Sequence, residues 1–96
     1  MKNFRTFVSE RERSKKYSAY PEERYAQIIA EYLEALCKEK SYKHEPNPYS
    51  YDFDEEWENI WWYLDVVVCQ GYKYPKYWCC QVVSLVKEYY HAPQAS

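Results

Sequence analysis

The chain of 96 residues contains a single glycine, Gly71. The tight turns that join most β-hairpins need backbone conformations that glycine adopts most readily, so a sheet built from many hairpins is disfavoured. Phosphate-binding loops and dinucleotide-binding fingerprints need several glycines at fixed spacing and are excluded. Gly71 follows a long apolar stretch, where it suits the left-handed conformation that ends many helices. We therefore expect an all-α chain.

Two segments that begin with proline have the apolar spacing of amphipathic helices. Pro21 suits the first position of a helix because its φ is already helical and its missing N–H would have no partner there. Pro75 begins the second segment. Helices are predicted over residues 21–40 and 75–91 because apolar side chains recur every three or four residues. The inward faces are Tyr25, Ile28, Ile29, Tyr32, Leu33, Leu36 and Cys37 in the first, and Trp78, Val82, Leu85, Val86 and Tyr89 in the second.

Residues 60–69, IWWYLDVVVC, are apolar or aromatic at every position except Asp65. Asp52 and Glu55 have the spacing of a capping box, and Gly71 stands where the helix should end. A helix over residues 53–70 is predicted, with Asp65 exposed or at the rim of a buried face. Its main apolar face is expected to consist of Trp57, Ile60, Trp61, Leu64, Val67 and Val68.

This third helix has more apolar surface than one face of a small bundle covers. Either it is the central helix, surrounded by the others, or part of it is exposed as an apolar patch that binds a partner. With Ile60 and Leu64 inward, its two flanks consist of Trp62, Val66 and Cys69 and of Tyr63 and Val67.

The first 20 residues form a basic N-terminal arm. They hold six basic and two acidic residues, for a net charge of +4. Phe4, Phe7 and Val8 stand at helical spacing near its start, which is a weaker pattern and predicts a short helix. Residues 41–51, with two prolines, are expected to form a loop, and residues 92–96 a tail. The predicted fold is a single domain over residues 1–96: a compact bundle of three helices plus the N-terminal one.

Four cysteines lie inside apolar runs: Cys37, Cys69, Cys79 and Cys80. Their placement favours reduced, buried thiols in an intracellular, cytoplasmic protein, although a disulfide between two helices stays open. No pair has zinc-ligand spacing, so no metal or cofactor is expected. No window of the sequence is apolar enough for a membrane-spanning helix.

No catalytic set is recognisable in the sequence. The acidic run 52–58 fails as a calcium loop because Trp57 and Tyr63 occupy the two most demanding positions. Acids at a helix start are also favoured by the helix dipole, so the run has a structural explanation. His44 and His91 stand at spacings that select no cysteine or acid as a partner. We expect neither an enzyme nor a small-molecule substrate.

Nucleic-acid binding is the alternative function that the composition supports. Lysine and arginine neutralise phosphates, and tyrosine rings such as those of Tyr17 and Tyr20 stack on bases. Two glutamates interrupt the basic run, and the chain as a whole carries a net charge of −2. The candidate residues are Arg5, Arg11, Arg13, Lys15 and Lys16.

The favoured function rests on the aromatic content, which is 21% with 13 tyrosines and 4 tryptophans. Tyrosine and tryptophan are enriched at protein interfaces. The sequence predicts a small protein-interaction module that modulates or inhibits another protein, or binds itself as a homodimer. Accessory proteins of viruses and phages, including inhibitors of host defence, fit the same description. The expected contacts are Trp62, Tyr63, Val66, Tyr72, Tyr74 and Tyr77.

Overall fold

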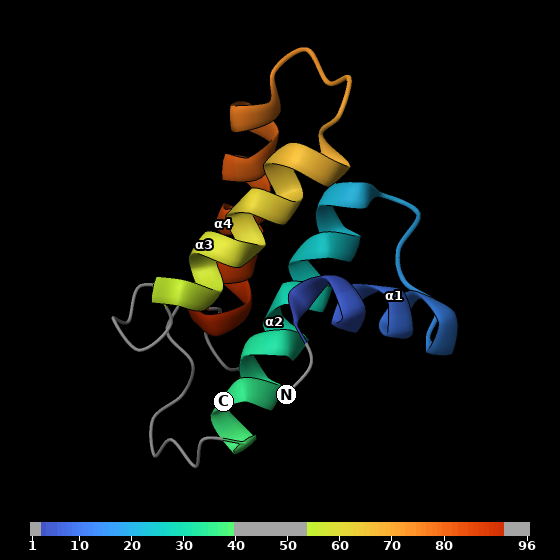
Figure 1. The fold of residues 1–96 in the computed structure, drawn as a ribbon, viewed down its shortest axis with the longest axis vertical. Coiled ribbons are helices and arrows are strands. Elements are labelled where there is room, and N and C mark those ends of the chain that lie inside the picture. Colours follow the sequence, from blue (N-terminus) through green and yellow to red (C-terminus); the bar gives the residue numbers. More distant parts are fainter. Residues whose placement is uncertain (1–2, 40–53, 92–96) are drawn as a thin grey trace.

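The computed structural model describes residues 3–39 and 54–91, and every element in them is helical (Figure 1). The predicted all-α fold is confirmed, and α2 and α4 lie within one residue of their expected bounds, whereas the segment predicted as one helix over 53–70 is divided into α3 and η2. The expected loop 41–51, the tail 92–96, His44 and the cap at Asp52 lie outside the described residues. The elements are α1 (Phe4–Ser14), α2 (Pro21–Glu39), α3 (Asp54–Trp62), the π-helical η2 (Tyr63–Val68) and α4 (Pro75–His91).

The central helix of the described structure is α2. Its entire predicted apolar face is buried, and Ile28, Ile29 and Leu33 have no solvent exposure. It packs most extensively against α4, and α1 crosses it from another side (Figure 1). The α3–η2 segment packs against α4 and α1 at the edge of this arrangement. The sequence left open which helix is central, and α2, not the segment containing residues 60–69, takes that place.

Trp78 joins the first turns of α2 and α4 to the connection between η2 and α4. Its buried ring meets Tyr25 and Tyr72 edge to face, with centroids 5.9 and 5.5 Å apart. Its indole nitrogen donates a 2.9 Å hydrogen bond to a carboxylate oxygen of Glu22. A buried tryptophan needs such an acceptor, so this contact sets how α4 lies on α2.

A second aromatic cluster docks α1 on the bundle. Phe4 lies between Tyr32 of α2 and Tyr63 of η2, with ring centroids 5.2 and 5.5 Å away. Phe7 contacts Tyr32 at 5.1 Å, and Val8 is buried beside them. Asn3 caps the helix by accepting a 2.9 Å hydrogen bond from the Thr6 amide. The short N-terminal helix is therefore confirmed, and its three apolar residues are core residues.

The segment 53–70 differs from the predicted α-helix after Trp62, because Tyr63–Val68 is π-helical. There the Cys69 amide donates a 2.9 Å bond to the Leu64 carbonyl, which is the five-residue interval of a π-helix. The inward side chains are therefore Ile60, Leu64 and Cys69, with Val68 partly buried. The prediction was wrong for Trp61 and Val67, which were expected inward and are exposed, and for Cys69, which was expected on a flank.

Gly71 ends this segment as expected. Its φ of 89° is a conformation that side-chain-bearing residues rarely adopt, and the Tyr72 amide closes the turn on the Cys69 carbonyl at 2.8 Å. The space around Gly71 is open, so any substitution there is strained by the backbone and not by a clash.

The π-helical turn behaves geometrically as a one-residue insertion between Leu64 and Cys69. We expect deletion of Val67 to restore α-helical spacing and to leave the free energy of unfolding unchanged or higher, since α geometry is the more favourable. Deletion of the exposed Ser84 from α4 is the matched control. It rotates Val86 and the rest of α4 by about 100° relative to Val82 and should cost on the order of 3 kcal/mol. Urea denaturation followed by circular dichroism measures the free energy of unfolding of both deletion variants. An equal loss of stability in the two variants would contradict the view that η2 contains a one-residue insertion.

Candidate functional site

The outward face of α3 and η2 exposes large apolar side chains. Trp62 is 56% exposed and Val66 49%, and Trp61 and Val67 lie beside them at 36% each. They are exposed because Ile60, Leu64 and Cys69 occupy the inward positions of the same segment. Scattered exposed apolar residues are ordinary, but a grouped set on one helix is typical of a partner surface.

A shallow depression of about 570 Å³ lies on this face. Its lining consists of Trp57, Glu58, Trp61, Trp62 and Asp65. Trp57 is half-buried against the core, whereas the other two indoles face outward. Indole faces attract both apolar groups and cations, and two carboxylates add negative charge at the rim. We call these five residues together with Val66 the tryptophan surface.

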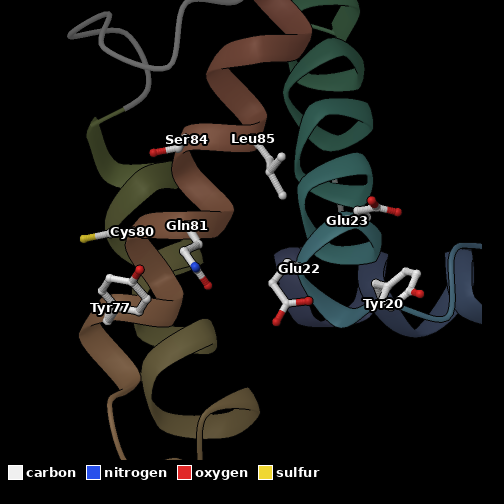
Figure 2. A pocket seen from close by; sticks show the side chains of 8 residues that line it. All are labelled: Tyr20, Glu22, Glu23, Tyr77, Cys80, Gln81, Ser84 and Leu85. Atoms are coloured by element: carbon white, nitrogen blue, oxygen red, sulfur yellow. The ribbon is translucent and has the colours of Figure 1, made fainter.

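The predicted contacts Tyr72 and Tyr74 lie in the connection between η2 and α4, and Tyr77 lies on α4. Tyr72 packs on Trp78 and is 41% exposed, whereas Tyr74 is 67% exposed with the Lys73 ammonium 5.6 Å from its ring centroid. Tyr77 lines a groove between α2 and α4 (Figure 2). Of the six residues predicted from the sequence, Trp62 and Val66 belong to the tryptophan surface.

Tyr63 differs from the other five predicted contacts. Its ring is half-buried against Phe4 of α1, and burial raises the pKa of its phenol. The sequence reasoning missed four contacts of the tryptophan surface. Trp57 and Trp61 were assigned to the inward face, Glu58 was treated only as part of a helix start, and Asp65 was expected exposed or at the rim but was not named as a contact. The run of three valines, which weakens α-helix propensity, was the one available signal of the irregular turn.

Two basic side chains of the N-terminal arm, Lys15 and Arg11, are engaged in contacts within the chain. Lys15 forms a 2.7 Å salt bridge with Glu31 of α2, and the Arg11 guanidinium stacks 4.9 Å from the Phe7 ring centroid. Tyr17 also donates a hydrogen bond to Glu31. Arg5, Arg13 and Lys16, the remaining nucleic-acid candidates, have exposed side chains.

The Glu31 carboxylate accepts the hydrogen bonds of both Lys15 and Tyr17. Partial burial acts to raise the pKa of its carboxyl, but the hydrogen bonds from Lys15 and Tyr17 outweigh burial and lower the pKa below its usual value. Burial, and then the hydrogen bond to Glu31, raise the pKa of Tyr17. The folded chain therefore favours ionised Glu31 beside neutral Tyr17.

The four thiols are free, and three of them, in Cys37, Cys69 and Cys79, are buried. The Sγ atoms of Cys69 and Cys79 lie 3.8 Å apart, and burial raises the pKa of Cys79 to about 12. Protonated thiols of this kind are poor nucleophiles. Cys80, expected among the buried thiols, is exposed.

Within residues 3–39 and 54–91, no three His, Cys, Asp or Glu side chains are grouped so that they could hold a metal ion. None of the described helices combines the length and apolarity needed to cross a bilayer.

The sequence matches no protein-family model, and no curated protein or solved structure is detectably similar to it. Function is therefore inferred from the chemistry of the surfaces alone.

Replacing Glu31 tests the contact that holds the basic arm. A group with a lowered folded pKa stabilises the protein above its unfolded pKa, about 4.3 for glutamate, and loses that effect as the pH falls through the folded value. We expect Glu31→Gln to lower the free energy of unfolding by about 1 kcal/mol near neutral pH, since the contact is partly solvated. The difference in the free energy of unfolding between Glu31→Gln and the wild type should shrink below about pH 4.

Urea denaturation at several pH values measures this effect. Glu34→Gln, an exposed glutamate one turn further along α2, is the matched control and should leave stability unchanged. A deficit for Glu31→Gln that stays constant down to acid pH would show that the ionised carboxylate is not what stabilises the arm.

Proposed function

We propose that this chain is a small protein-interaction module, which binds a partner protein through the tryptophan surface and thereby modulates or inhibits it. The observation that supports this most directly is the outward display of Trp61, Trp62 and Val66 on one helical segment, beside the depression that Trp57 helps to form. These residues contribute little to the fold because Ile60, Leu64 and Cys69 already fill the inward positions.

The energetics of aromatic burial favour a binding role. A tryptophan side chain can bury roughly 150–250 Å² and has few rotatable bonds to immobilise. Tryptophan is also the residue most enriched among interface hot spots, where truncation costs about 2 kcal/mol or more. Trp62, the most exposed of the three, is the residue that we expect to dominate binding.

The charge of the tryptophan surface indicates the kind of partner. Glu58 and Asp65 border the indoles, and the depression contains no basic side chain among its lining residues. A symmetric homodimer through this face would bring the carboxylates of both copies into one interface, where like charges repel. A different protein that presents an apolar anchor beside lysine or arginine fits better than a second copy.

The free thiols support a site of action inside the cell. Free buried cysteines persist where the redox environment is reducing, as in the cytoplasm. Nucleic-acid binding is the weaker proposal, because Lys15 and Arg11 are engaged by Glu31 and Phe7. Only Arg5, Arg13 and Lys16 of the five candidates are left to contact phosphates.

Substitution of Trp62 tests the proposed function. The partner is first captured from the native host with the wild-type chain, with and without nuclease treatment, and identified by mass spectrometry. We expect a protein in both samples, and we expect Trp62→Ala to raise the dissociation constant for the purified partner by at least about tenfold. Thermal stability should stay close to the wild-type value because the side chain is exposed.

Tyr74→Ala is the matched control, because Tyr74 is an exposed aromatic residue in the connection between η2 and α4, outside the tryptophan surface. It should bind the partner as the wild type does. Equal binding by Trp62→Ala and the wild type would refute the tryptophan surface as the site. Capture that disappears after nuclease treatment would favour the nucleic-acid proposal.

A further inference from the structure

A groove separate from the tryptophan surface lies between the first turn of α2 and one face of α4. Its volume is about 680 Å³, within the range of sites that hold small ligands or a short peptide segment. Figure 2 shows Gln81 and Leu85 of α4 and Glu22 of α2 extending into the space between the two helices. Tyr20 and Tyr77 stand at opposite sides of this space. The remaining lining residues are Glu23, Cys80 and Ser84.

The groove combines negative charge with aromatic rings. Glu22 and Glu23 supply two carboxylates, and the lining contains no lysine, arginine or histidine. Tyr20 and Tyr77 are 69% and 68% exposed, the two most exposed large hydrophobic residues in the described structure. A cation between carboxylates and aromatic faces gains from both, by charge pairing and by attraction to the ring quadrupole.

The two carboxylates are held in place before any partner arrives. Glu22 accepts the hydrogen bond from Trp78, and Glu23 accepts a 2.9 Å hydrogen bond from the Ser18 hydroxyl. A carboxylate has about four lone-pair positions, so each retains acceptor capacity for another donor. Fixed acceptors reduce the conformational entropy that binding must otherwise cost.

We infer that this groove binds an extended segment of a partner protein through an arginine side chain. The guanidinium would lie between the carboxylates of Glu22 and Glu23 and against the Tyr20 ring, which stands on the same side of the groove as Glu23 (Figure 2). Arginine suits the site better than lysine because its planar group pairs with carboxylates through two hydrogen bonds and stacks on aromatic faces. Leu85 would contact the methylene groups of the same side chain, and the Gln81 amide would be free to bond the peptide backbone. This site rests on charge complementarity in the groove and does not depend on the tryptophan surface.

The probe for this site is the blocked pentapeptide Ala-Leu-Arg-Leu-Ala, compared with the same peptide carrying citrulline, a neutral isostere of arginine. Amide NMR spectra of the full-length chain are recorded as each peptide is added. We expect shifts concentrated at Tyr20, Glu22, Glu23, Gln81 and Leu85 with the arginine peptide. The citrulline peptide should bind at least about tenfold more weakly, and added salt should lower the affinity for the arginine peptide.

Two exposed variants report on the groove without disturbing the core. Glu23→Gln and Tyr20→Ala should each weaken binding of the arginine peptide by about fivefold, whereas Glu34→Gln, on the same helix outside the groove, should leave binding unchanged. Glu22 is left intact because it also anchors Trp78.

Several results would overturn the inference. Equal affinity for the arginine and citrulline peptides would remove charge as the basis of binding, and shifts confined to Trp61 and Trp62 would move the site to the tryptophan surface. Shifts of the groove residues that grow with protein concentration in the absence of peptide would show that a second copy of the chain fills the groove instead. Loss of binding in Trp62→Ala but not in Glu23→Gln would likewise contradict it.

Discussion

The burial of one face of α2 against α4 is the interaction on which the other elements depend. Ile28, Ile29 and Leu33 are fully buried there, and Val82 and Val86 are fully buried on α4. Trp78 fixes the relative orientation of the two helices, because its hydrogen bond to Glu22 and its ring contact with Tyr25 hold their first turns together. Once these helices are joined, α1 and the α3–η2 segment can only occupy peripheral positions.

The irregular turn in η2 follows from that peripheral position. To keep Ile60, Leu64 and Cys69 inward, the segment inserts one extra residue in its last turns and bonds at five-residue intervals. Such turns are less favourable than α-helix and are frequent at functional sites. Here the extra residue turns Val66 and Val67 outward beside Trp62, so that the same distortion that serves the core also enlarges the exposed apolar face.

Charge is distributed so that the exposed aromatic surfaces are acidic. The basic arm is partly neutralised from within, because Lys15 pairs with Glu31 and Arg11 stacks on Phe7. The tryptophan surface and the groove between α2 and α4 each place two carboxylates beside exposed rings. Both surfaces therefore favour partners that carry lysine or arginine, by the same electrostatic complementarity.

The sequence by itself determined the helices, because local signals specify them. Prolines at 21 and 75 and the glycine at 71 indicated where elements begin and end, and apolar spacing identified the inward face of α2 completely. Those signals act over a few residues and need no knowledge of neighbouring helices. The tryptophan surface was predictable in part: a helix apolar on nearly every side had either to be surrounded by the others or to expose an apolar patch, and the sequence left both open.

Only the tertiary structure decided which side of residues 60–69 is exposed. Residues 60–69 are apolar on nearly all sides, so periodicity could not select an inward face, and packing against α4 and α1 selected Ile60, Leu64 and Cys69. The same packing placed Trp61 outside and Tyr63 against Phe4. Long-range pairs such as Lys15 with Glu31 and Trp78 with Glu22 join residues far apart in the chain, and no local pattern encodes them. Side-chain position follows from the sum of such contacts, which exists only once the helices have assembled.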